Sequence, residues 1–569
     1  MNAPQPALVA SPERVRLVGE KRRLLAITHQ RLMLGLLVFV AGIALVSLRI
    51  FWLAAFGDSD TRTGGVAAYV PPRGDIIDRE GETLARTIDA WTIAIQPHRV
   101  IGNKLDLARS LAQLMPEKDE ADYLAMLQGD KNFIYLRRRA SPRLVEAVNT
   151  LGEPGIQLMR EPDRLYPQLS LAAHVVGYTD VDGKGVAGAE RAFQGRLADA
   201  SMRAEPVQLS ISSRVQQALE HELQSAVDEF SAIGAAGVIM DIHTGEVLAM
   251  TSLPQLNPNV AGEGSVEQRF NRAGLGVYEL GSTFKPFTVA MAMDAGHIRS
   301  MGQMYNCPKS LTIGNRTISD THPFGRACSV AEIMMESSNI GTAQIAQELG
   351  ADKQREFLEG MGFMKRSELE LLERGRPLTP PGNPWSEIST VTVGYGHGIA
   401  VTPLHLASGY ATLLNGGLYR PPTILKIPEG AKPPAGERVY SEQTSYRMRA
   451  LLRLVVTKGT GKKADAPGYR VGGKTGTAEK LVNGRYSKQL VTNSFAGVFP
   501  MDEPRYVAVV MLDEPKGTKD TFGFRTAGWN VAPVVSRTIS RIAPMLGVRP
   551  NMGREPDMSE VLPYVFEDE

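Results

Sequence analysis

The chain has 569 residues, which is too long for a single domain, and roughly three or four structural units are expected. Its hydrophobic content of 43% and charged content of 22% are ordinary for a globular protein. The net charge of +2 conceals an uneven distribution, because the first 31 residues carry six basic side chains against two acidic ones.

An apolar run follows this basic stretch. Residues Leu32–Leu48 carry no charge, and beyond Arg49 the run continues to Phe56. About 20 apolar residues span a bilayer core, and Arg49 is close enough to one end to reach an interface. A buried core helix would show a polar face, and the long leader disfavours a cleaved signal peptide. The sequence therefore predicts a transmembrane anchor at 32–56.

The flanking charges predict the orientation of this anchor. The positive-inside rule places the basic tail, residues 1–31, in the cytoplasm and everything after the anchor outside. In a Gram-negative cell the expected location is the inner membrane, crossed once, with the large C-terminal part in the periplasm. Cys307 and Cys328 would then lie in an oxidising compartment, where a disulfide and two free thiols are both open. The sequence has no Cys/His cluster with metal-ligand spacing, so neither a metal nor a cofactor is expected.

The region after the anchor contains no nucleophile with a neighbouring base. The stretch Pro71–Gly81 joins a Pro-Pro pair, a short β-like segment and a charged turn, which predicts a hairpin. Helical spacing of leucines is present at 107–114, and a shorter helical stretch is expected at 121–127. Residues 57–220 are therefore predicted to form a non-catalytic spacer, or pedestal.

The next region, residues 221–546, is predicted to be the catalytic domain. Apolar runs at 236–241 and 246–250 flank a Thr-Gly turn, which indicates a β-hairpin, and a second pair of runs occurs late in the chain. Strands at both ends with helices between them fit an α+β sandwich, in which an antiparallel sheet is flanked by helices and the two ends of the domain pair. The tail, 547–569, is expected to be disordered. The remaining predicted segments are helices at 215–230, 285–295, 330–349 and 404–414 and strands at 494–500 and 505–512.

The first candidate motif is Ser282-Thr283-Phe284-Lys285, at a turn entering a predicted helix. Positions i and i+3 share a helix face, so Lys285 would lie beside Ser282. A serine hydroxyl is a poor nucleophile until a neighbour takes its proton, and a lysine does so only when burial or a second cation lowers its pKa. Lys474 could be that second cation. The structural alternative is a helix cap with a surface lysine.

The second motif is Ser337-Ser338-Asn339. It could interrupt a helix, with Ser337 relaying a proton and Asn339 binding a substrate amide. A capping cluster between helices is the alternative reading.

The third motif is Lys474-Thr475-Gly476-Thr477, which has β-like character. Gly476 would let a substrate lie against the strand, while Thr475 and Thr477 offer hydroxyls to a carboxylate. The backbone N–H groups of Ser282 and Thr477 are candidates for an oxyanion hole. The alternative is a glycine-rich turn with an exposed lysine.

In this order the three motifs resemble those of the penicillin-interacting serine acyltransferases, and their context resembles class B penicillin-binding proteins. The resemblance extends from the anchor to about residue 533, with small departures at Leu280, where proline is common, and His405, where glutamine is common. The supporting segments are Tyr278–Pro286, Gly472–Ala478, Arg73–Ala85, Arg164–Tyr178 and Gly394–Gly396 leading to Val401–Pro403.

Within that family the chain looks most like the cell-division (septal) peptidoglycan D,D-transpeptidases. The resemblance implies the penicillin-binding transpeptidase fold after a dimerisation-type spacer, and an acyl-enzyme on Ser282 formed from a D-Ala-D-Ala stem peptide. It implies β-lactams as inhibitors, and a SEDS-type glycosyltransferase and other divisome membrane proteins as partners, with no nucleic acid. An elongation-specific transpeptidase, a β-lactamase and a non-catalytic scaffold of the same fold are the alternatives.

Overall fold

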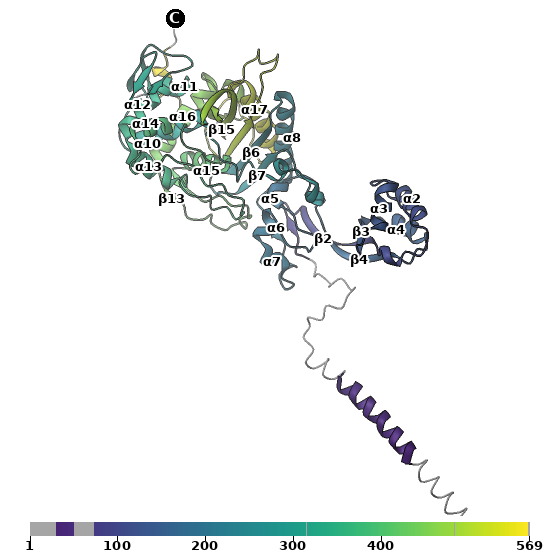
Figure 1. Ribbon diagram of the computed structural model, residues 1–569. Coiled ribbons are helices and arrows are strands. Elements are labelled where there is room, and N and C mark those ends of the chain that lie inside the picture. Colours follow the sequence, from purple (N-terminus) through teal and green to yellow (C-terminus); the bar gives the residue numbers. More distant parts are fainter. Residues whose placement is uncertain (1–29, 50–72, 315, 483, 567–569) are drawn as a thin grey trace, which may run out of the picture. The chain divides into compact units, whose positions relative to one another are not determined.

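The computed structural model describes residues 30–49, 73–314, 316–482 and 484–566 of the chain. The chain divides into two compact units, Met1–Ala68 and Tyr69–Glu569. In the first unit the helix Gln30–Arg49 has 20 residues and, by length and composition, is able to cross a membrane (Figure 1). The basic tail up to residue 29 and the end of the predicted anchor, 50–56, lie outside the described residues.

The second unit is built on a five-stranded antiparallel sheet. Its strand order is β14-β15-β16-β6-β7, so β14 lies at one edge and β7 at the other. Both hairpins predicted in the catalytic domain are confirmed, because β6 pairs with β7 and β15 pairs with β16. The predicted pairing of the two ends of the domain is also confirmed, since β16 lies beside β6. The strands are β6 (Gly234–Asp241), β7 (Val247–Leu253), β14 (Gly472–Val482), β15 (Arg485–Phe499) and β16 (Tyr506–Asp513).

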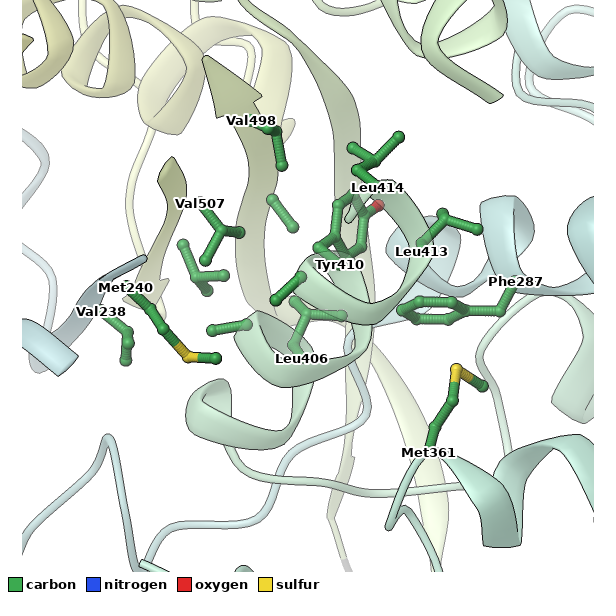
Figure 2. Packing of buried hydrophobic residues seen from close by; sticks show 14 of the residues in the cluster. Val238, Met240, Phe287, Met361, Leu406, Tyr410, Leu413, Leu414, Val498 and Val507 are labelled. Carbon is green, nitrogen blue, oxygen red and sulfur yellow. The ribbon is translucent and has the colours of Figure 1, made fainter. Parts of the chain in front are cut away.

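Helices cover both faces of this sheet, which makes the predicted sandwich. On one face α8 (Ser213–Phe230) and α17 (Ala527–Met545) share an apolar cluster with the strands. On the other face, α10 (Lys285–Asp294), α15 (Pro403–Leu414) and α16 (Glu442–Thr457) pack in the largest cluster. Figure 2 shows Leu406, Tyr410 and Leu414 beside side chains from β6, β15 and β16. Successive residues of a strand point to opposite faces, so the fully buried strand β16 contributes to both clusters.

The helical segment predicted at 330–349 is interrupted. It forms α11 (Val330–Met335) and α12 (Asn339–Leu349), each started by a serine cap, Ser329 and Ser338. The break between them carries the Ser337 motif, as the sequence indicated. Between α12 and α15 lie α13 (Ala351–Gly360) and α14 (Glu387–Gly394).

The spacer has a tip with its own core and a base that shares the core of the catalytic part. In the tip, helices pack on a sheet around buried residues such as Ile93, Leu111 and Tyr123. At the base, Ile76 and Tyr166 belong to the same cluster as the helices of the catalytic part. The boundary predicted at residue 220 falls inside α8 and marks no break in the structure. The spacer contains β1 (Ile76–Ile77), β2 (Thr83–Ile95), β3 (Ile134–Ala140), β4 (Ile156–Leu165), β5 (Val207–Gln208), α2 (Lys104–Leu114), α3 (Glu120–Gln128), α4 (Pro142–Asn149), α5 (Ala173–Val176), α6 (Gly188–Ala192) and α7 (Gln194–Ala198).

The chain beyond α17 differs from the disorder expected of it. Between residues 547 and 566 it packs back on the catalytic part, where Val561 is fully buried. Arg453 of α16 donates to both carboxylate oxygens of Glu555, at 2.7 and 2.6 Å. The proline-rich composition suggested disorder, but these long-range contacts hold the segment in place.

The two cysteines form a disulfide. Cys307 ends β8 (Met304–Cys307) and Cys328 lies in β11 (Arg326–Ser329), and these strands pair antiparallel. The loop that the disulfide closes contains a small hairpin, β9 (Leu311–Ile313) and β10 (Arg316–Ile318). Of the two states left open by the sequence, the structure has the paired one.

Candidate active site

Ser282 lies in a short 3-10 turn, η3 (Gly281–Phe284), that runs directly into α10. The side chain of Ser282 is half-buried, and Lys285 is the first residue of the α-helix. Pro286 is tolerated there because the first residues of a helix have no intrahelical partner for their N–H groups. Ser282 and Lys285 are therefore neighbours at the start of one helix, as the spacing predicts.

Glycines let the backbone of η3 approach two other segments. Gly281 has φ of +55°, and its N–H donates to the carbonyl oxygen of Gly396 at 3.2 Å. A Cβ on Gly396 would lie 1.9 Å from the carbonyl oxygen of Gly281. A Cβ on Gly476 of β14 would lie 2.2 Å from the carbonyl oxygen of Leu280. Gly476 therefore makes room for the turn that carries Ser282, and the room for a substrate that the sequence suggested there stays a prediction.

Lys285 is completely buried and contacts the middle motif. Its Nζ donates a hydrogen bond to the carbonyl oxygen of Ser337 and another, at 3.1 Å, to the Ser337 hydroxyl. Burial lowers the pKa of Lys285 well below its ordinary value, and the positive charge of Lys474 lowers it further. The carboxylate of Asp320 acts in the opposite direction. Lys285 is therefore in a setting that favours a neutral amine, the form that accepts a proton.

The Ser337-Ser338-Asn339 motif forms the turn between α11 and α12. Ser337 has φ of +64°, in the left-handed region that non-glycine residues rarely adopt. Ser338 is buried and caps α12, accepting a hydrogen bond from the N–H of Gly341 at 2.9 Å. Asn339 is half-buried, and its Nδ2 donates to the carbonyl oxygen of Ser319 at 3.0 Å. One Asn339 donor is thus engaged within the protein.

Lys474 is the second completely buried lysine. Its Nζ lies 3.3 Å from the carbonyl oxygen of Thr475 and 3.4 Å from the hydroxyl of Thr460. Burial lowers the pKa of Lys474 to about 7, although the carboxylate of Glu336 raises it in part. Two buried lysines from different elements, α10 and β14, thus interact electrostatically in the same site.

The hydroxyls of the third motif have partners in the protein. Thr475 is buried and shares a hydrogen bond of 2.9 Å with Thr460. The Thr477 hydroxyl is half-buried and accepts a hydrogen bond from the N–H of Ala527, at the start of α17, at 3.0 Å. Because β14 is an edge strand of the sheet, the side of its backbone away from β15 is available to pair with an extended peptide.

Sequence reasoning missed residues that the fold brings to these motifs. Asp320, Glu336 and Thr460 contact or electrically influence the two lysines. His397 is a further one, because burial and the charge of Lys285 lower its pKa to about 4. Glu336 stands directly beside Ser337 in the sequence and could have been suspected. Asp320, Thr460 and His397 carry no local signal.

The structure thus gathers all three predicted motifs at one place: a serine at a helix start, two buried lysines, and a hydroxyl between helices. This arrangement is able to activate a serine for acyl transfer. Family comparison gives the same result. Residues 235–535 match the penicillin binding protein transpeptidase domain, and residues 68–196 match the penicillin-binding protein dimerisation domain. The chain belongs to the class B penicillin-binding proteins.

Relatives of this class B chain match over most of its length. It is 40% identical over 514 residues to the "Probable peptidoglycan D,D-transpeptidase FtsI" of Caulobacter vibrioides, covering 89% of this chain and 86% of that protein. It is 31% identical over 508 residues to the peptidoglycan D,D-transpeptidase FtsI of Escherichia coli, with 83% and 85% covered. Among solved structures, penicillin binding protein 3 of Mycobacterium tuberculosis complexed with ampicillin has a TM-score of 0.67 at 27% identity, covering 86% of this chain and 97% of that one.

Proposed function

We propose that this class B penicillin-binding protein is a septal serine D,D-transpeptidase that cross-links peptidoglycan stem peptides during division. The observation that carries the proposal is the pair of completely buried lysines, Lys285 and Lys474, beside the turn that holds Ser282. Burying two cations together is costly unless one of them gives up its proton. A neutral lysine next to a serine hydroxyl is the base that serine acyl transfer requires.

In the first half-reaction, Ser282 Oγ attacks the carbonyl carbon of the penultimate D-Ala and gives its proton to Lys285. The C–N bond to the terminal D-Ala breaks, and the proton reaches the leaving amine through the Ser337 hydroxyl, which lies 3.1 Å from Lys285 Nζ. Terminal D-Ala departs and an ester remains on Ser282. The backbone N–H groups of Ser282 and Thr477 would stabilise the oxyanion.

In the second half-reaction, an amino group of a neighbouring stem peptide attacks the ester. Its proton returns to Ser282 Oγ along the same route, and the new amide is the cross-link. Lys474, Thr475 and Thr477 are the proposed partners of the substrate carboxylate, and the edge of β14 at Gly476 pairs with the peptide backbone. Asn339 is assigned to a substrate amide, which would exchange its present contact with Ser319.

The cellular setting is proposed from the N-terminal part of the chain and from similarity. The apolar helix Gln30–Arg49 would anchor the chain in the inner membrane, with the basic tail cytoplasmic and the catalytic domain periplasmic. Similarity to proteins named FtsI supports the septal role. The proposed partners are a SEDS-type glycosyltransferase and other divisome membrane proteins, with β-lactams as inhibitors. Depletion should give filamentous cells, whereas swollen, rounded cells would indicate an elongation role.

Intact-mass analysis tests the reaction directly. The full-length chain in detergent is incubated with a fluorescent penicillin, beside Ser282→Ala and the exposed control Ser201→Ala. We expect one slowly lost adduct on wild type and on the control, and none on Ser282→Ala. Rapid turnover of the adduct would indicate a β-lactamase, and no adduct on wild type would indicate a non-catalytic scaffold.

A further inference from the structure

The loop closed by the disulfide carries a carboxylate that has no role in the proposed reaction. Asp320 follows β10, and its Oδ1 accepts hydrogen bonds from the backbone N–H groups of Asn339 and Ile340. Its Oδ2 accepts a hydrogen bond from the Ser338 hydroxyl at 2.6 Å. The same stretch, at Ser319, receives the Asn339 side-chain amide at 3.0 Å. Asp320 therefore fixes the start of α12 through charge-assisted hydrogen bonds.

These contacts begin one residue after the strained position. Ser337, at φ of +64°, is held on its other side by the end of α11, where the N–H of Glu336 donates to the carbonyl oxygen of Glu332 at 2.9 Å. A left-handed serine persists only where its surroundings determine the backbone on both sides. The Ser337 carbonyl and hydroxyl are both acceptors for Lys285 Nζ. The position of Lys285 is thus linked to Asp320 through two adjacent residues, Ser337 and Ser338.

Asp320 also sets the charge balance around Lys285. The charged and titratable groups that act on or face Lys285 are Lys474 of β14, His397 of the loop after α14, and Asp320. Lys474 lowers the pKa of Lys285, and Asp320 raises it. Glu336 acts on Lys474. Asp320 is therefore the carboxylate that limits how far the two cations disfavour a proton on Lys285.

We propose that Asp320 is a positioning residue for acylation, which holds the Ser337 turn against Lys285 and sets the charge at that lysine. It acts through Ser338, Asn339 and the field at Lys285, without touching the substrate. The proposal rests on the proposed acylation of Ser282.

The test is the rate of acylation by a fluorescent penicillin, measured against pH for the full-length chain and for Asp320→Asn. Misplaced groups should slow acylation by about 10-fold to 100-fold. The pH dependence should move as well. Lys285 accepts the proton only when neutral, so the rate falls as pH drops through its pKa. Removing the negative charge lowers that pKa further, so the acid limb should shift to lower pH.

Variants separate the two roles of Asp320. Ser338→Ala removes two hydrogen bonds, the one to Asp320 and the one from the N–H of Gly341, and keeps the charge, so acylation should slow with the acid limb in place. Glu336→Gln should not move the acid limb to lower pH, because Glu336 acts on Lys474, and a less protonated Lys474 lowers the pKa of Lys285 less. Asp119→Asn is the control, because the Asp119 carboxylate also accepts a hydrogen bond from the first turn of a helix, α3, in the spacer. It should leave the rate and the limb unchanged.

An Asp320→Asn variant with the wild-type rate, or with a slower rate and an unshifted limb, would overturn the proposal. If Asp320→Asn does not fold, a wild-type rate in Ser338→Ala overturns it instead. Wild type that is not acylated at all would reject the proposed function first. That result is distinct from a failure of Asp320 in an active enzyme.

Discussion

Two groups of buried charges in this protein have opposite arrangements. At the base of the spacer Glu190 is completely buried, and Arg73 and Arg164 donate to its two oxygens at 3.0 and 2.6 Å. In the active site Lys285 and Lys474 are equally buried, yet they repel each other. The spacer group keeps its charges because each has an opposite partner, whereas the lysines are pushed toward losing protons. Buried charge thus stabilises the fold in one region and prepares chemistry in the other.

The largest effect is expected from a substitution of Lys285. We expect Lys285→Met to slow acylation by a factor of about 100 to 10,000, because a general base is lost. Stability should not fall, since an apolar side chain avoids the cost of burying an amine beside the charge of Lys474. Acylation rate and urea unfolding, measured on the same detergent-solubilised chain, check both parts. The exposed Lys353→Met is the control, and a Lys285→Met variant that is acylated normally would remove Lys285 from the mechanism.

The matching change in the spacer, Glu190→Gln, should lower stability and leave the acylation rate unchanged. Glu190→Gln leaves two buried guanidinium groups without their carboxylate, so we expect a loss of about 3–5 kcal/mol in the free energy of unfolding. Acylation of the folded molecules should be unchanged. Glu120→Gln, which removes an exposed partner of Arg109, should cost about 0–1 kcal/mol. Equal losses in the two variants would mean that the buried group does not stabilise the base of the spacer.

A substitution of Gly476 should affect both stability and acylation, because this residue packs against the turn that carries Ser282. An added methyl group would press on the Leu280 carbonyl, so Gly476→Ala should cost about 1–3 kcal/mol of stability and also slow acylation by moving the Ser282 turn. Gly262 has open space around it and serves as the control for a Gly-to-Ala change. If Gly476→Ala slows acylation with stability intact, the earlier interpretation of Gly476 as space for substrate is the better one.

The sequence predicted those parts of the fold that depend on neighbours along the chain. Apolar runs on either side of turn residues identified the β6–β7 and β15–β16 hairpins, and the i, i+3 spacing placed Lys285 beside Ser282. The break at Ser337 was readable from small polar residues within a helical pattern. Pairing of the two ends, β6 with β16, followed from the need of a strand for a partner.

The parts that were missed depend on contacts between distant segments. Asp320 meets Ser338 from 18 residues away, and Thr460 meets Lys474 from 14 residues away, with no motif in either case. The contact of Gly476 with Leu280 was not predicted, because nothing in the sequence around Gly476 reveals that Leu280 lies against it. The proline-rich tail was expected to be disordered, and its contact with Arg453, about 100 residues upstream, could not be read from its composition. Composition describes what a segment prefers alone, and these contacts override it.

The smallest predicted effect is a change of stability with pH, which tests whether Lys474 is neutral in the folded protein. The pKa of Lys474 is about 7 in the folded protein, against an ordinary value of 10.5. Between these values the unfolded chain binds one proton more than the folded chain. The free energy of unfolding should therefore rise with pH, by at most about 1.4 kcal/mol per pH unit from this residue.

Lys474→Met should remove this contribution, which urea unfolding at several pH values within that window would measure. Lys480→Met is the matched control on the same strand. Lys480 donates hydrogen bonds to Asp513 and Glu514, whose carboxylates raise its pKa. At any pH below the ordinary pKa of a lysine, Lys480 is therefore protonated in the folded and the unfolded chain and adds no slope. If the free energy of unfolding rises with pH equally in wild type and Lys474→Met, Lys474 keeps its proton in the folded protein. Lys474 would then be the cation whose charge lowers the pKa of Lys285, and Lys285 alone would be the neutral lysine of the pair.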